Sequence, residues 1–129
     1  MSEFSNALSV SAHALKAQAT RLRHVSENIS NADTPGYRRK SVSFETTRGP
    51  DGTDLLTVGR VQLDKSELEQ IFDPAHPMAD DTGHYQGSNV DLMLEIADAR
   101  EAQRSYEANL KMFDQTRQMS AGLMDLLRK

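Results

Sequence analysis

The sequence predicts a mainly α-helical chain with a long helix at each end and a loop-rich central insertion that contains short β-strands. Three observations lead to this fold class. Apolar residues recur with heptad spacing near the N-terminus and again near the C-terminus, while the middle is rich in proline, glycine and short alternating patterns. We therefore expect paired terminal helices over 1–31 and 88–129, and a central loop or β-hairpin insertion over 32–87.

The N-terminal helix is predicted by apolar residues that follow one another in alternating steps of four and three. We call this stripe the N-terminal seam, and its apolar members are Phe4, Leu8, Leu15, Leu22, Val25 and Ile29. The polar residues Ser11 and Gln18 occupy its two remaining positions. Several alanines beside the seam keep the helix narrow and favour its formation.

This first helix is expected to stop in the segment 28–37. The turn motif there consists of Asn28, Asn31, Ala32, Thr34, Pro35, Gly36 and Tyr37. Asparagine side chains can bond the last free carbonyls of a helix and tolerate left-handed backbone geometry. The last four residues of the motif read as a type II turn, in which proline fixes φ at the second position and glycine supplies a positive φ at the third.

The central insertion is expected to hold short strands and one long loop. Val42 and Phe44 alternate with polar residues as in a short strand, and 55–63 reads as a second strand. Residues 48–53 form the turn between them, and 73–83, with two prolines and a glycine, is expected to be an extended loop.

The C-terminal helix repeats the heptad pattern. Its apolar and aromatic stripe, the C-terminal seam, includes Leu92, Ile96, Tyr106, Leu110, Phe113 and Leu127. A second track widens the apolar arc toward the end and consists of Met112, Met119, Leu123 and Leu126. Ser88 and Asp91 have the spacing of a capping box at its start. Pairing the two terminal helices would bury one seam of each and leave the second track exposed, which favours an interaction surface.

Composition narrows the functional classes. The apolar fraction is 37%, below the roughly 45–50% of an average globular domain, so burial is expected to be completed against other chains. A net charge of −4 argues against nucleic-acid binding, and the absence of cysteine excludes thiol catalysis and disulfides. The start of the chain has no signal-peptide pattern, and no apolar run is long enough to cross a bilayer, so the protein is expected to be cytoplasmic or exported without a cleaved signal.

Candidate chemistry is sparse. His76 and His84 lie near three aspartates, but their spacing matches no metal motif, and we interpret 73–84 as a solvated turn. Neither a nucleophile elbow nor a glycine-rich phosphate loop occurs. We therefore predict no enzyme activity and assign no catalytic, cofactor-binding or metal-binding residue. The basic run 38–40 is interpreted as a solvated or inter-subunit patch, and His13 and His24 as surface residues.

An N-terminal heptad helix that ends in the turn motif closely resembles the flagellar basal-body rod, hook and hook-associated proteins. Its partner would be the C-terminal helix, which carries Tyr-Glu-Ala-Asn at 106–109. The loop 72–80, together with 83–85 and 88–90, is similar to short proximal-rod members of that family. The resemblance covers both ends and this loop, and the region 45–65 contributes little to it.

The resemblance implies that the terminal helices pair as a coiled coil and that copies stack helically into the rod, the shaft that carries torque from motor to hook. The implied partners are copies of this chain, other rod proteins and the flagellar type III export apparatus, with no nucleic acid, small-molecule substrate or membrane span. It also implies a periplasmic location reached without a cleaved signal. The alternative is a small acidic type III secretion chaperone or export helper, which would be a compact dimer with a central sheet.

Overall fold

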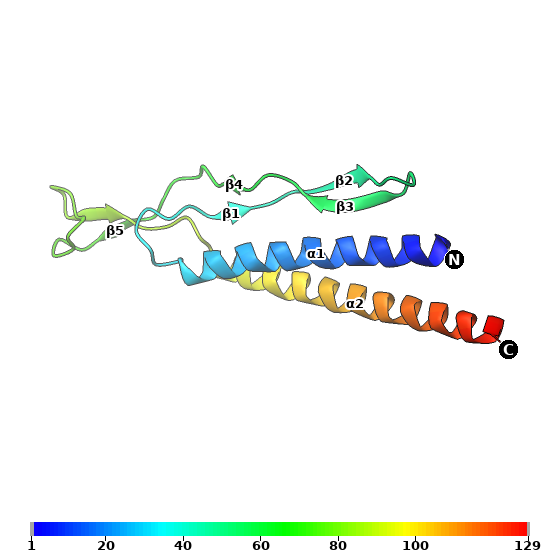
Figure 1. The fold of residues 1–129 in the computed structure, drawn as a ribbon. Coiled ribbons are helices and arrows are strands. Elements are labelled where there is room, and N and C mark those ends of the chain that lie inside the picture. Colours follow the sequence, from blue (N-terminus) through cyan, green and yellow to red (C-terminus); the bar gives the residue numbers. More distant parts are fainter. Residues whose placement is uncertain (1, 129) are drawn as a thin grey trace.

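The structure is a computed structural model that describes residues 2–128. Two long helices, α1 and α2, run side by side in opposite directions, and the connection between them forms thin β-ribbons (Figure 1). The elements are α1 Ser2–Ser30, β1 Lys40–Ser41, β2 Phe44–Arg48, β3 Asp54–Val58, β4 Gln62–Leu63, β5 Gln70–Phe72, β6 His84–Gln86 and α2 Leu92–Arg128. The predicted fold class, terminal helices around a central region with short strands, is confirmed.

The molecule is thin and buries little apolar surface. Its accessible surface is 9111 Å², whereas a compact chain of this mass exposes about 6,800 Å². Among the described residues, the buried apolar side chains are Ala17, Val25 and Ala102. Small residues at these positions let the helices approach closely, but they supply little hydrophobic stabilisation.

Four short strands form a ribbon that returns along α1. β2 pairs with β3 as an antiparallel hairpin from Phe44 opposite Val58 to Arg48 opposite Asp54, and β1 pairs with β4. The hairpin packs on α1 through β3 (Figure 1). The expectation of one strand over 55–63 is wrong, because two short strands cover it: β3 ends at Val58, residues 59–61 belong to no strand, and β4 begins at Gln62.

The segment 73–83 is the tip of a hairpin rather than an extended loop. β5 and β6 are antiparallel, with Ile71 opposite Tyr85, and the hairpin projects beyond the ends of the helices, on the side opposite both chain termini (Figure 1). Local turn bonds fold the tip tightly, since Asp73 N–H donates to the Gly83 carbonyl at 2.9 Å and Asp80 N–H to that of His84 at 2.8 Å. The strands flanking the tip are too short to leave a sequence pattern.

α2 begins with a different cap from the one expected. Asp91, not Ser88, is the N-cap: its carboxylate accepts the backbone N–H of Met93 at 3.1 Å, and its carbonyl accepts that of Glu95. At the other end α2, with 37 residues, outruns the 29 residues of α1 (Figure 1). Neither helix is both long enough and apolar enough, within residues 2–128, to cross a bilayer.

Candidate functional site: a polar clamp at the end of the first helix

The turn motif closes α1 with a compact series of turns. Asn31 donates its side-chain amide to the Glu27 carbonyl at 2.8 Å, which satisfies a carbonyl in the last turn of the helix. Tyr37 N–H donates to the Thr34 carbonyl at 3.2 Å, and Gly36 between them has φ of +74°. That positive φ is what the third position of a type II turn requires. No non-glycine residue within 2–128 has a positive φ, so neither asparagine adopts left-handed geometry.

Asn28 is the centre of the site and does not bond the end of its own helix. Its side-chain amide is fully buried and donates to the Lys40 carbonyl at 2.8 Å and to a Glu95 carboxylate oxygen at 3.2 Å. Its side-chain oxygen accepts from the Tyr37 hydroxyl at 2.8 Å and from Lys40 N–H at 2.9 Å. All four hydrogen-bonding positions of the amide are therefore used. The asparagine pairs with the backbone of Lys40 as a neighbouring strand would.

Glu95 brings α2 into the same site. Its side chain is fully buried, and its second carboxylate oxygen accepts a short hydrogen bond from the Arg39 guanidinium. Arg39 also donates to Asp98 at 3.2 Å, and Arg21 from α1 reaches the other Asp98 oxygen at 3.0 Å. Burial lowers the pKa of Arg39, but the hydrogen bond and charge of Glu95 outweigh that effect and raise it. A buried carboxylate is tolerated here because it is paired and hydrogen-bonded.

We call Asn28, Tyr37, Arg39, Lys40 and Glu95 the polar clamp. It joins α1, the segment after the turn and α2 at one point. Lys40 completes it with an ion pair to Glu27 at 2.8 Å, and this hydrogen bond lowers the pKa of Glu27 and raises that of Lys40. Burial raises the pKa of Tyr37, so its hydroxyl stays a donor at neutral pH.

The chain that returns to α2 is fixed against the clamp by backbone bonds. Gly36 N–H is shared between the carbonyls of Gln86 and Gly87, at 3.2 and 3.0 Å. Ser88 donates a short hydrogen bond to the Ala32 carbonyl, and Asn89 accepts Arg39 N–H at 2.6 Å. The segments before α2 and after α1 therefore support one another.

The clamp includes residues whose role the sequence did not reveal. The run 38–40 is not a solvated patch: Arg39 and Lys40 are paired, and Arg38 donates to the carbonyls of Asp64 and Ser66. The interpretation of His24 as a surface residue is also wrong, because it is buried. The one signal for Glu95 was a carboxylate inside the apolar run 92–96.

The structure places the seam residues at very different depths. In α1, Val25 is buried, Ile29 is exposed, and Phe4, Leu8, Leu15 and Leu22 lie between, while the polar Ser11 and Gln18 are buried. In α2, Tyr106 and Phe113 are half-buried, and Leu92, Ile96, Leu110 and Leu127 are exposed. The most buried positions of α2 are Glu95 and Ala102, one residue before the predicted seam. Whether the exposed seam residues make assembly contacts stays a prediction.

The histidines of the hairpin tip have local partners. His76 stacks on Tyr85 with ring centroids 3.8 Å apart, and His84 lies 3.0 Å from the Thr82 hydroxyl. Within residues 2–128, no group of three or more histidine, aspartate and glutamate side chains is arranged to hold a metal ion.

An extended helix pair with three buried apolar side chains has the build of a structural assembly subunit, whose burial is completed between chains. Comparison with known proteins identifies the family. Residues 8–38 match the flagella basal body rod protein family, and residues 81–126 match the C-terminal region of the flagellar basal body rod FlgEFG proteins. The first segment contains Asn28 and Tyr37 of the clamp and the second contains Glu95, whereas Arg39 and Lys40 follow directly after the first.

Individual relatives agree with this. The flagellar basal-body rod protein FlgC of Agrobacterium fabrum is 41% identical, with 99% of this chain and 98% of the relative aligned. FlgC of Bacillus subtilis is 33% identical over 88% of this chain and 91% of its own, and that of Salmonella typhimurium is 30% identical over 88% and 90%. The chain therefore belongs to the flagellar basal-body rod protein family and is a structural component of the rod, not an enzyme.

Proposed function

We propose that this chain is a subunit of the proximal rod that assembles helically with copies of itself and with other rod proteins, and that the assembled shaft transmits torque from motor to hook. The observation that carries the proposal is the unburied apolar surface of a well-formed helix pair. Among the residues that the structure describes, eighteen large apolar side chains are exposed by more than a third, whereas three apolar side chains are buried. Surface of this kind marks an interaction site.

The largest part of that surface lies on the last turns of α2. We call it the α2 tail, and its exposed apolar members are Met112, Met119, Leu123, Met124, Leu126 and Leu127. The last turn of α2 extends past the start of α1, and the tail residues that lie further back along α2 are exposed although α1 runs beside them (Figure 1). We propose that neighbouring subunits bury the α2 tail together with the exposed seam residues.

The polar clamp connects the insertion to both terminal helices, which supports a role in transmitting force. It ties 32–87 to both terminal helices through Asn28 and Glu95, whose hydrogen bonds are buried and paired. A force applied to the insertion would therefore reach both helices at the same point. We propose the division into a helical core, 1–31 and 88–129, and an insertion, 32–87, on this basis.

We further propose that the flagellar type III export apparatus delivers the chain to the periplasm without a cleaved signal. The absence of cysteine supports passage as an unfolded chain, because no wrong disulfide can form on arrival.

The test is a variant of the α2 tail in a strain that lacks the native gene. Leu126→Gln together with Leu127→Gln removes exposed apolar surface and should leave the helix content of the isolated chain unchanged. We expect loss of swimming and of the tagged subunit from purified basal bodies. The control is Glu107→Gln, an exposed polar change in α2. Normal rods and motility with the tail variant, or without the chain altogether, would show the proposal to be wrong.

A further inference from the structure

We propose that the tip of the β5–β6 hairpin of one copy binds a groove on the outer face of α2 in a second copy. The inference rests on the proposed helical assembly and names one contact within it. The tip is the segment 73–83 together with Phe72 and His84, the strand residues that flank it, and the groove is lined by Met93, Ile96, Ala97, Arg100, Glu101 and Arg104.

The tip is built to hold one shape. The Asp80 carboxylate accepts hydrogen bonds from the Thr82 hydroxyl at 2.6 Å, from Thr82 N–H at 2.9 Å and from His84 N–H at 3.1 Å. The hydrogen bond from the Thr82 hydroxyl is the main cause that lowers the pKa of Asp80, which favours the charged carboxylate. His76 stacks on Tyr85 across the hairpin. A segment ordered by its own bonds loses little conformational entropy when it binds a partner.

The surface of the tip combines apolar and acidic groups. Phe72 is 65% exposed although its ring centroid lies 5.1 Å from that of His84, and Met78 is 62% exposed. Asp73, Asp80 and Asp81 are exposed around them and carry three negative charges. The tip therefore requires a partner with an apolar floor and a positive rim.

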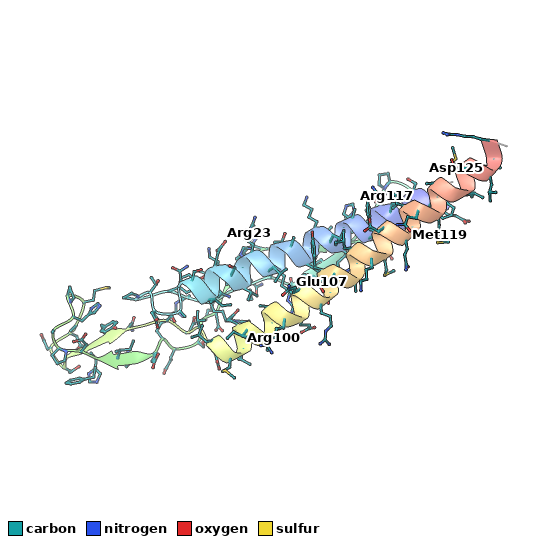
Figure 2. The ribbon with its side chains drawn as sticks, turned by 90° about the horizontal axis from the view of Figure 1, so that it is seen from below. Arg23, Arg100, Glu107, Arg117, Met119 and Asp125 are labelled. Atoms are coloured by element: carbon teal, nitrogen blue, oxygen red, sulfur yellow. The ribbon has the colours of Figure 1, made fainter. Side chains whose placement is uncertain are left out.

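The groove on α2 has those properties. It is an open, shallow site lined by one face of α2, and Met93 and Ile96 in it are 78% and 42% exposed. Within residues 2–128, neither Arg100 nor Arg104 forms an ion pair within 4.0 Å, so both charges remain available. Glu101 already forms an ion pair with Arg21, at 3.4 Å. Figure 2 shows Arg100 on the edge of α2 that faces away from α1.

The α2 tail fits the tip less well, because its charges alternate in sign and Arg117 already lies 3.8 Å from Asp114. Within one chain the tip points away from the helices, so the tip and groove must belong to different copies (Figure 1). A contact between two different surfaces extends into an open helical array when the rotation between copies does not close into a ring, as the proposed helical assembly requires.

Introduced cysteines test the contact directly, because the chain has none of its own. Met78→Cys with Met93→Cys places a thiol in the tip and in the groove, and Met78→Cys with Met119→Cys is the matched pair for the α2 tail. Purified basal bodies that carry each variant are treated with a short bismaleimide. We expect a ladder of dimers and higher multimers from the first pair and only traces from the second. A ladder from the second pair alone overturns the inference.

Charge reversal provides the independent measurement. Arg100→Glu and Asp81→Lys should each lower incorporation of the subunit into basal bodies roughly fivefold, and their combination in one chain should restore it. Arg117→Glu is the control and should not be rescued by Asp81→Lys. Basal bodies that contain the chain but show neither the ladder nor the rescue overturn this contact and leave the proposed function standing. Basal bodies that lack the native chain overturn the proposed function itself.

Discussion

The two ends of the helix pair differ in what they bury: one end buries polar side chains, and the other leaves apolar side chains exposed. At the end of α1, Asn28 and Glu95 are fully buried polar side chains, and every hydrogen-bonding position of the asparagine has a partner in the same chain. At the end of α2, the apolar side chains of Leu126 and Leu127 are 67% and 70% exposed. The first end is complete within the chain, and we propose that the second end is buried by other molecules.

The polar end and the apolar end therefore have different physical roles: one determines the geometry of the fold, and the other favours association. Buried polar groups stabilise one geometry only, because any other arrangement leaves them without hydrogen bonds. Apolar contacts are less directional and supply free energy wherever complementary surface is available. We therefore propose that the clamp defines how the chain folds and that the exposed surface provides the free energy of association.

The largest expected effect comes from removing the buried carboxylate of the clamp. Glu95→Ala leaves Arg39 and Asn28 without their partner and should lower the free energy of unfolding by about 3 kcal/mol. Urea unfolding followed by circular dichroism measures this. Glu107→Ala, an exposed glutamate of the same helix, should change it by less than about 0.5 kcal/mol. Equal effects of the two changes would mean that the clamp does not specify the fold.

The next effect concerns the amide at the centre. Asn28→Ala leaves the backbone of Lys40 and the Tyr37 hydroxyl unsatisfied and should cost about 2 kcal/mol. Ser26→Ala, at an exposed position of α1, should be close to neutral. Hydrogen exchange at Lys40 N–H gives a local readout, which should rise in the first variant and not in the second.

Two glycines give opposite predictions. A methyl group added at Gly36 or Gly122 would meet nothing within 4 Å, so only the backbone decides the outcome. Gly36→Ala must adopt φ near +74° and should destabilise the chain by about 1–2 kcal/mol. Gly122→Ala lies inside α2 and should stabilise it by about 0.5–1 kcal/mol. Thermal unfolding should therefore shift in opposite directions, and a shift in the same direction would show that the turn does not require glycine.

The smallest effect is the pH dependence of the ion pair between Glu27 and Lys40. The pKa of Glu27 is lowered from its usual 4.5, so the pair contributes fully above that value and its contribution is lost as pH falls through the lower pKa of the folded state. The pKa of Lys40 is raised from 10.5, so the contribution persists below that value and is lost as pH rises through the higher folded-state pKa. Glu27→Gln should flatten the acid limb of a stability–pH curve, and an unchanged limb would exclude this pair as its source.

The helices and the turn could be predicted because neighbouring residues determine them. The polar clamp and the β5–β6 hairpin could not, because they depend on contacts between residues that are far apart in the sequence. Heptad spacing and the Pro35–Gly36 pair are contained in short windows of sequence, and α1 ends at Ser30 as the asparagines indicate. Glu95 lies far from Arg39 in sequence, and a carboxylate among apolar residues does not reveal which cation will reach it. The same holds for β5 and β6, whose pairing is three residues long and is stabilised by the bonds within the tip.

The scarcity of buried apolar side chains has a calorimetric consequence. Heat-capacity change on unfolding scales with the apolar area that becomes exposed, and so does the steepness of denaturant unfolding. An isolated chain in which, among residues 2–128, Ala17, Val25 and Ala102 are the apolar side chains that are buried should therefore unfold with a small heat-capacity increment and a shallow urea dependence for its length. The missing increment should appear as a large negative heat-capacity change when subunits associate, because that is the step at which most of the apolar surface leaves water.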